Sequence, residues 1–63
     1  MDAPPLGARV RFLDTDVWGK RTIPRTGRYL GRGFWGDHVI EVAGFVGPLT
    51  TRELPTLVEV PRA

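Results

Sequence analysis

Cysteine is absent from the 63-residue chain, and histidine occurs once, at His38. The lack of thiols excludes a disulfide framework, the thiolate ligands of most structural zinc sites and a cysteine nucleophile. His38 has no carboxylate four residues away and no marked nucleophile or orienting group beside it, so it lacks the partners that a metal site or a general base needs. We therefore expect a non-enzymatic protein without metal or cofactor, in which His38 is a partly covered strand residue.

Long apolar runs are also missing. No run approaches the roughly 18 residues that span a bilayer, and the opening MDAPPLGA has neither the basic start nor the apolar stretch of a signal peptide. We expect a soluble cytoplasmic protein with a single domain, because a chain of this length buries only about 60% of its unfolded surface. Two adjacent prolines predict a flexible arm at residues 1–7, and the single small β-barrel domain is expected at residues 8–63.

The charges of the chain are unevenly distributed. Residues 1–32 hold seven Lys/Arg and three Asp, a net charge of +4, whereas the remainder holds two Arg and four Asp/Glu, a net charge of −2. This asymmetry favours an anionic partner for the first half. It equally fits association of the acidic half of one copy with the basic half of another.

A period of two residues in the hydrophobic pattern indicates β-strands. In residues 8–14, Val10 and Phe12 alternate with Arg9 and Arg11, which is typical of a strand with one buried face. By the same pattern and by β-branched content, further strands are expected at residues 27–31, 37–42, 45–49 and 56–60.

The connections carry their own signals. Residues 14–26 have no clean period, so we expect a long loop or a folded-back hairpin there. Thr50 and Glu53 fit a capping box, and Pro55 stops a helix after one turn, which predicts a short 3₁₀ turn at residues 50–54.

Five short strands, a long first loop, two glycine-rich hairpin turns and one helical turn before the last strand resemble the Src-homology-3-like small β-barrel class. The resemblance covers residues 8–60 and rests on the order and spacing of the elements. It implies an all-β, five-stranded antiparallel barrel, a closed form that removes the exposed edges of so small a sheet. Peptide-binding members carry an acidic first loop and an ALYDY-like run. This chain has neither, so we do not expect it to bind proline-rich peptides; other members of the wider class bind nucleic acid.

The alternating positions also predict the hydrophobic core. Its expected members are Val10, Phe12, Tyr29, Ile40, Val42, Phe45, Leu49, Leu54, Leu57 and Val60. The pattern does not decide whether Tyr29 or Leu30 points inward.

Two aromatic residues lie between glycines in the segment GRGFWG, residues 31–36, where we expect a hairpin turn. If the alternation of the following strand is continued backwards, Phe34 falls on the core face and seals one end of the barrel, while Trp35 falls outside. Trp18, in the first loop, is either a packing residue over an open end of the barrel or a binding residue.

Basic residues of the first half form the candidate site together with the tryptophans. Arg9 and Arg11 lie on the outer face of the first strand, and Arg28 and Arg32 are expected to extend this stripe on the second. Cations neutralise phosphates and exposed aromatic rings stack on bases. We therefore expect a nucleic-acid-binding surface, for DNA or RNA, with an accessory or regulatory role. Its members are Arg9, Arg11, Trp18, Lys20, Arg21, Arg25, Arg28, Arg32 and Trp35.

Other functions fit the same residues. In a protein-interaction or assembly module, Trp18 and Trp35 are anchors for a larger partner or for another copy of the chain. A third option is an oligomeric enzyme with its site on a symmetry axis, as in the plasmid-type dihydrofolate reductase that the chain resembles in size and expected fold, although no motif supports it. The simplest interpretation of the arginines is a solvated face that keeps the protein soluble.

Overall fold

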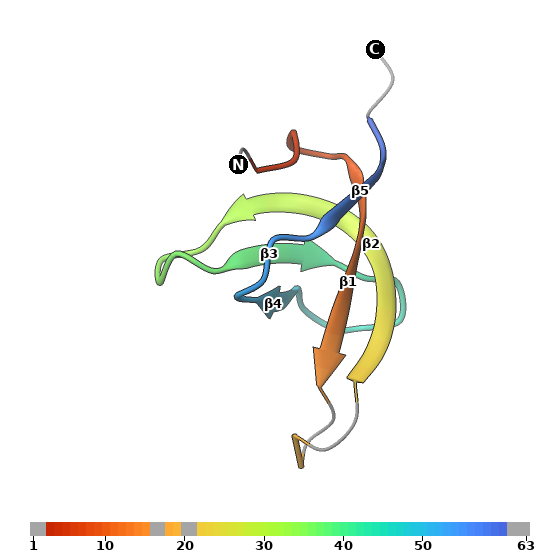
Figure 1. Ribbon diagram of the computed structural model, residues 1–63, viewed down its shortest axis with the longest axis vertical. Coiled ribbons are helices and arrows are strands. Elements are labelled where there is room, and N and C mark those ends of the chain that lie inside the picture. The colour runs from red at the N-terminus through yellow and green to blue at the C-terminus, as the bar shows by residue number, and fades with distance from the viewer. Residues whose placement is uncertain (1–2, 16–17, 20–21, 61–63) are drawn as a thin grey trace.

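The computed structural model describes residues 3–15, 18–19 and 22–60 (Figure 1). These residues contain no helix and five strands: β1 (Arg9–Thr15), β2 (Thr22–Arg32), β3 (His38–Glu41), β4 (Leu49–Thr51) and β5 (Thr56–Glu59). The strands form one antiparallel sheet in the order β4-β3-β2-β1-β5. The predicted all-β class with five antiparallel strands is confirmed. Within the described part of the chain, nothing has the length and hydropathy of a membrane-crossing helix.

Strand β2 joins the two halves of the sheet, since residues 22–28 pair with β1 and residues 28–32 pair with β3. Where the two halves meet, a Cβ on Gly27 would collide with the carbonyl oxygen of Glu41 and the side chain of Ile40, so glycine allows the strands to approach this closely. The sheet curls around this point (Figure 1), and Cα atoms of β1 and β4 come within 8 Å of each other. No ladder joins β4 to β5 in the described residues, so the sheet is curled but open.

Residues 14–26, for which a long loop or a folded-back hairpin was expected, largely form a hairpin. Strand β1 continues past Asp14, and β2 starts at Thr22. Pro24 lies opposite Leu13 in this ladder. The proline is tolerated because this part of β2 pairs only with β1 among the described strands, so no second neighbour needs the missing N–H.

Two elements near the end of the sheet differ from expectation. The strand expected at residues 45–49 lies later, as β4, and the segment 50–54 shows bends rather than a 3₁₀ turn. Thr50 and Thr51 pair with β3, because β-branched residues favour a ladder over a helical turn. The hydroxyl of Thr51, not of Thr50, accepts a hydrogen bond from the Glu53 N–H at 3.3 Å.

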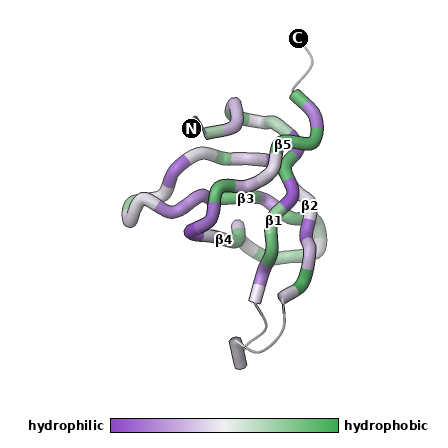
Figure 2. Tube along the Cα trace, in the orientation of Figure 1, coloured by the Kyte–Doolittle hydropathy of each residue, from purple (hydrophilic) through white to green (hydrophobic). Residues whose placement is uncertain are grey.

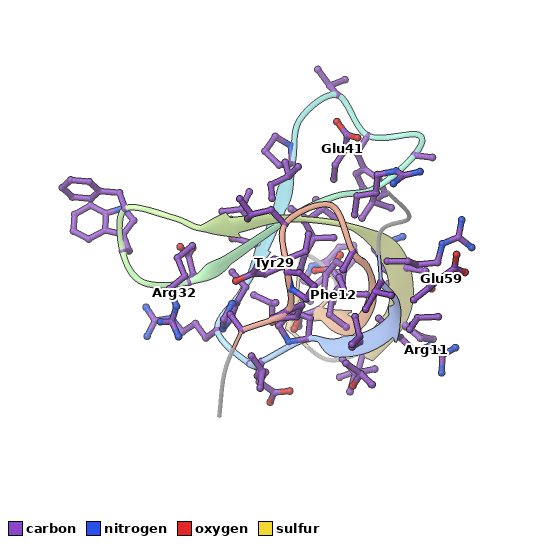
Figure 3. All side chains as sticks on the ribbon, turned by 90° about the horizontal axis from the view of Figure 1, so that it is seen from above. Arg11, Phe12, Tyr29, Arg32, Glu41 and Glu59 are labelled. Atoms are coloured by element: carbon purple, nitrogen blue, oxygen red, sulfur yellow. The ribbon has the colours of Figure 1, made fainter. Side chains whose placement is uncertain are left out.

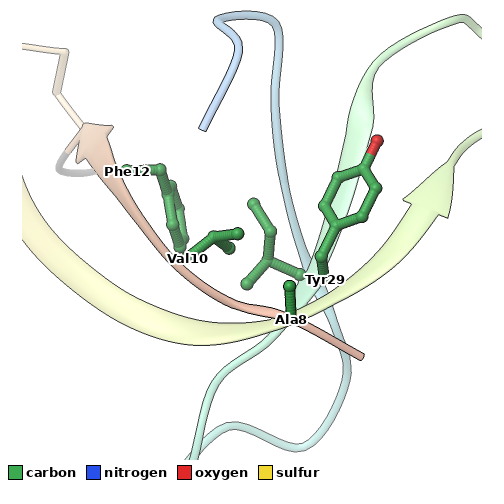
Figure 4. Close-up of a cluster of buried hydrophobic side chains, with 5 residues drawn as sticks. Ala8, Val10, Phe12 and Tyr29 are labelled. Carbon is green, nitrogen blue, oxygen red and sulfur yellow. The ribbon is translucent and has the colours of Figure 1, made fainter. Parts of the chain in front are cut away.

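The core lies on the concave face of the curled sheet (Figure 4). Hydrophobic and hydrophilic residues alternate along β1 (Figure 2), which turns Val10 and Phe12 inward. The buried hydrophobic side chains are Ala8, Val10, Phe12, Tyr29 and Ile40. Four of these were predicted, and Tyr29 rather than Leu30 points inward. Of the other predicted members, Val42 and Leu49 pack partly buried against the cluster, and Leu54 is half-buried.

Three predicted core residues, Phe45, Leu57 and Val60, are exposed instead. Phe45 lies in the connection between β3 and β4, outside both ladders. Leu57 pairs with Val10, but β5 is the edge of the sheet. Among the described strands, none pairs with β5 on the side away from β1. Val60 follows the end of β5. Alternation therefore predicts which side a residue faces, but it does not predict whether that side is covered.

His38 belongs to the core, although the sequence indicated only partial cover. Its side chain is 4% exposed, and its Nδ1 lies 2.8 Å from the hydroxyl oxygen of Tyr29. Among the described side chains, no buried nitrogen or oxygen lacks a hydrogen-bond partner. The histidine is thus a buried polar residue whose polar atom is satisfied within the fold.

Residues 3–7, in the predicted arm, lie along β2. The N–H of Gly7 donates to the carbonyl of Tyr29 at 2.8 Å, and the N–H of Tyr29 donates to the carbonyl of Ala8 at 2.8 Å. Ala3 packs partly buried against the core. This segment therefore extends the backbone pairing between β1 and β2 and adds Ala3 to the border of the core.

Candidate functional site

The most exposed aromatic side chains lie at the tip of the β2–β3 hairpin, which projects from one side of the sheet (Figure 1). Phe34 is 91% exposed and Trp35 is 85% exposed. Their rings pack edge to face, with centroids 4.9 Å apart and planes at 85°, a preferred geometry for aromatic pairs. Trp35 is outside, as predicted. Phe34 is also outside, so the prediction that it seals the core is wrong.

The turn that carries this pair is closed by backbone hydrogen bonds. The N–H of Gly33 donates to the carbonyl of Asp37 at 2.8 Å, and the N–H of Gly36 donates to the carbonyl of Gly33 at 3.1 Å. Gly36 has a φ of 81°, which favours glycine. Since the last pair of the ladder is Arg32 with His38, Phe34 and Trp35 lie beyond it, and strand alternation does not apply to them.

The outer face of the sheet carries a row of four charged residues across four strands. Arg9 on β1 lies directly opposite Arg28 on β2. Arg9 also pairs with Glu59 on β5, and Arg28 also pairs with Glu41 on β3. The row therefore reads Glu59, Arg9, Arg28, Glu41, and its two positive charges are matched by two negative ones. The predicted basic stripe exists here, but acidic residues flank it.

Arg11 is the remaining basic residue of this face, and its cross-strand partners are uncharged. It lies opposite Thr26 on β2 and Thr56 on β5. Its side chain is exposed. Within the described sheet, Arg11 is therefore an outer-face cation with no charged residue directly opposite it.

A groove of about 490 Å³ opens beside the charged row. Its lining residues are Arg9, Thr26, Gly27, Arg28, Glu41, Val42, Ala43, Gly44 and Phe45. Both signs of charge and apolar side chains contribute to it. The groove lacks the single sign of charge that would mark a phosphate-binding cleft.

Arg25 lies on the inner side of β2 rather than in a loop. It pairs with Phe12 in the ladder, and its Nε donates to Asp14 Oδ2 at 2.8 Å, with both side chains about one quarter exposed. Its guanidinium also lies 4.6 Å from the centre of the Phe45 ring, within the range of a cation–π contact. Arg25 is thus engaged in the fold itself.

Arg32 does not continue the stripe of Arg28, and that prediction is wrong. A bulge between Tyr29 and Gly31 inserts one residue, so Arg32 pairs with His38 and faces the same side as that buried histidine. Figure 3 shows Arg32 beside the β2–β3 hairpin and Arg11 on the opposite side of the molecule. The two arginines therefore cannot contact one short ligand together.

The remaining predicted site residues come between β1 and β2 in the sequence. Trp18 is exposed near the tip of the β1–β2 hairpin, and this hairpin points in a different direction from the β2–β3 hairpin (Figure 1). Lys20 and Arg21 lie outside the described residues. The two tryptophans therefore do not form one surface.

Sequence reasoning missed Glu41 and Glu59 as neighbours of the arginines, since only the strand register brings them together. Among the described side chains there is no group of three His, Asp or Glu residues that could hold a metal ion. No family model matches the chain, and neither a curated protein nor a solved structure matches it. The interpretation of the site therefore rests on its geometry.

Proposed function

We propose that this chain is a non-enzymatic protein-interaction module that binds its partner through the tip of the β2–β3 hairpin. The observation that carries the proposal is the nearly complete exposure of the adjacent side chains of Phe34 and Trp35. Among the described residues, five hydrophobic side chains are buried in the core, so two large aromatic residues in solvent leave a large share of the apolar surface unburied. A partner surface that covers Phe34 and Trp35 would bury this apolar surface in the complex.

The energy available at this tip is large for a small contact. A buried aromatic side chain removes about 150 to 250 Å² from water, and truncation of such an anchor commonly weakens a complex by about 2 kcal/mol or more. Tryptophan is among the residue types most enriched at such positions. Phe34 and Trp35 side by side therefore suit an apolar pocket on another protein.

The hairpin is also organised before binding. The backbone hydrogen bonds at Gly33 and Gly36 close the turn, and the edge-to-face contact holds each ring against the other. Ordering of side chains and loops at an interface costs about 0.5 to 1.5 kcal/mol for each rotamer-rich side chain. A pre-organised tip lowers this cost.

A Src-homology-3-like barrel is the scaffold that we propose beneath this hairpin. The strand order β4-β3-β2-β1-β5 and the approach of β1 to β4 within 8 Å support it. In this arrangement the approach of β1 to β4 closes the curl, and β5 stays an edge of a partly open barrel. Slow amide hydrogen exchange in β4 of the monomer would support this barrel, whereas exchange in β4 at the rate of a free edge would contradict it.

Nucleic-acid binding is the second candidate function, and the exposed ring of Trp35 on the same hairpin as Arg32 favours it. Stacking on an exposed aromatic ring contributes about 1 to 3 kcal/mol per base, and Arg32 would neutralise a phosphate. The charge balance of Arg9 and Arg28 against Glu59 and Glu41 counts against a broader nucleic-acid surface. We therefore place this function second.

A first experiment separates the two functions. Fluorescence anisotropy with labelled single-stranded and duplex DNA and RNA, at two salt concentrations, measures nucleic-acid affinity for the wild type and for Trp35→Ala. Absence of binding at low salt excludes the second candidate. Tight single-strand binding that falls in Trp35→Ala with an unchanged salt dependence would instead make nucleic acid the ligand, because stacking releases few counterions.

A second experiment tests the protein partner directly. A photo-crosslinking amino acid at position 35 is compared with the same group at position 46, since Val46 is at least as exposed as Trp35 but lies in the β3–β4 connection. Any protein crosslinked only from position 35 is purified and titrated with the wild type and Trp35→Ala. A loss of affinity of at least about tenfold in Trp35→Ala is expected. Equal affinity of the two proteins would refute the proposal.

A further inference from the structure

Strand β5 is the longer of the two open edges of the sheet. It pairs with β1 on one side and ends the strand order on the other. All four of its residues are exposed, and it follows Pro55. The opposite edge, β4, also follows a proline, Pro48, but has only three residues, and a very short strand is a poor template for pairing. Of the two edges, β5 is therefore the better template for an additional strand.

The apolar residues of this edge are exposed in the free chain. Leu57 is 47% exposed and Val58 is 45% exposed, and Val60 follows them. Val58 is β-branched and favours a strand, and Leu57 adds apolar surface beside it, so the centre of this uncovered edge favours pairing with another strand. A strand laid along β5 would cover both.

The register of β5 on β1 allows the β5 strands of two copies to pair with their outward-facing residues on the same side. Thr56 pairs with Arg11 and Glu59 pairs with Arg9, so both β5 residues face outward with those arginines. Regular alternation would put residues 56 and 59 on opposite faces, and the bulge in this ladder brings them to the same face. In an antiparallel pair of β5 strands related by a two-fold axis, Thr56 can therefore lie opposite Glu59 of the second copy with matching faces.

This register also brings opposite charges together. Arg11 lies beside Thr56, and Glu59 of the second copy would lie on the other side of that threonine. The two charged residues are then two strand spacings apart, about 10 Å between backbones, which the long side chains of arginine and glutamate can bridge. At the axis, Leu57 of each copy meets Val58 of the other. An apolar centre with a charged rim is the usual anatomy of a protein interface.

We propose that two copies of this chain associate by antiparallel pairing of their β5 strands in this register, which joins the two open sheets into one. The contact pairs the β5 edge that each chain leaves open with a strand of the other copy. It also gives Arg11, which has no directly opposite charge in the described sheet, an acidic neighbour in Glu59 of the second copy. The bulge makes the edge a poor match for an arbitrary strand but a good match for its own copy. This surface is separate from the β2–β3 hairpin, so the two proposals fail independently.

Sedimentation equilibrium up to about 1 mM protein, the weak end of specific association, tests the dimer. The wild type is expected to reach twice the monomer mass of 7.0 kDa. Val58→Lys adds a charge to the edge and is expected to raise the dimer Kd by at least about tenfold, whereas the matched control Val46→Lys, at an exposed site outside the sheet, keeps the wild-type Kd. Trp35→Ala should also keep it. A wild type that stays monomeric, or equal Kd values for the two lysine variants, overturns the proposal.

A charge exchange between copies tests the register even if Val58→Lys fails to fold. Glu59→Lys and Arg11→Glu each create two like-charge contacts in their own homodimer, so each variant alone is expected to be monomeric where the wild type is dimeric. In a mixture, Lys at position 59 of one copy meets Glu at position 11 of the other, and the remaining Glu59 and Arg11 also meet. An equimolar mixture is therefore expected to regain the dimer. A mixture that stays monomeric would rule out this register.

Discussion

Tyr29 and His38 lie diagonally across the β2–β3 ladder and form a hydrogen bond inside the core. Tyr29 is directly opposite Ile40, two residues after His38 on β3. The Tyr29 Oη and the His38 Nδ1 are 2.8 Å apart, and the two residues are 1% and 4% exposed. Diagonal neighbours in an antiparallel sheet are about 7 to 8 Å apart, within reach of aromatic side chains. The hydrogen bond replaces the water that neither group can reach.

Tyr29→Phe is expected to lower the free energy of unfolding by about 1 to 3 kcal/mol, because it leaves the buried Nδ1 of His38 without a partner. His38→Leu should also destabilise the fold, since it orphans the tyrosine hydroxyl. The double variant should lose less than the sum of the two, because both polar groups are then gone. Urea unfolding of the four proteins measures this coupling, and strict additivity would show that the bond contributes nothing.

Phe12→Ala and Ile40→Ala are each expected to lower the free energy of unfolding by about 2 to 5 kcal/mol, the range for large-to-small changes in a core. Small domains have total stabilities near the low end of about 5 kcal/mol, so much of either variant should be unfolded. Val46→Ala, at a fully exposed site, should change stability by less than about 0.5 kcal/mol. Thermal melts measure the three variants. If Phe12→Ala and Ile40→Ala melt with the wild type, as Val46→Ala should, the buried face is assigned to the wrong side of the sheet.

Gly27→Ala is expected to destabilise the fold by about 1 to 3 kcal/mol, the usual effect of overpacking. The added methyl group would meet the Glu41 carbonyl and the Ile40 side chain where β2 passes from β1 to β3. Gly47→Ala is the matched control, because nothing lies within 4 Å of a Cβ there. The denaturant midpoints of the two variants are compared. Equal midpoints would show that β2 and β3 can move apart to accept the methyl group without a loss in the free energy of unfolding.

Glu41→Gln is expected to increase weak binding to duplex DNA, because it removes one of the two carboxylates that flank Arg9 and Arg28. The slope of log K against log salt should steepen by up to about 1 unit, the effect of one further phosphate contact. Glu53→Gln removes an equal charge near the β4–β5 connection and should have less effect. If both variants behave alike, only net charge matters and the charged row has no local role.

Strand alternation predicted the parts of the fold that depend on local pattern. In β1 the spacing of Val10 and Phe12 was sufficient, because the ladder there is regular over the whole strand. In β2 it failed at Arg32, because a bulge between Tyr29 and Gly31 shifts the phase by one residue. Glycines in this segment allowed a bulge without requiring one.

The candidate site was harder to predict than the fold, because a site depends on which strands are neighbours. Arg9 and Arg28 were expected on the same face, and the ladder brings them directly opposite each other. The flanking positions of Glu41 and Glu59 follow from pairings between residues far apart in the sequence. Phe34 lies beyond the last strand pair, where no period predicts orientation.

The small size of the core also determines how the protein responds to heat. At roughly 0.7 kcal/mol per residue near 60 °C, a chain of this length absorbs only about 45 kcal/mol on melting, so its transition is broad and 1 kcal/mol moves the midpoint by about 4 to 8 °C. A ligand at about 100 times its Kd adds about 2.7 kcal/mol, which corresponds to roughly 10 to 20 °C. For the same reason, the melting temperature should rise with protein concentration if two copies associate. A simple melting curve is thus a sensitive assay for any molecule that covers the hairpin tip or the β5 edge.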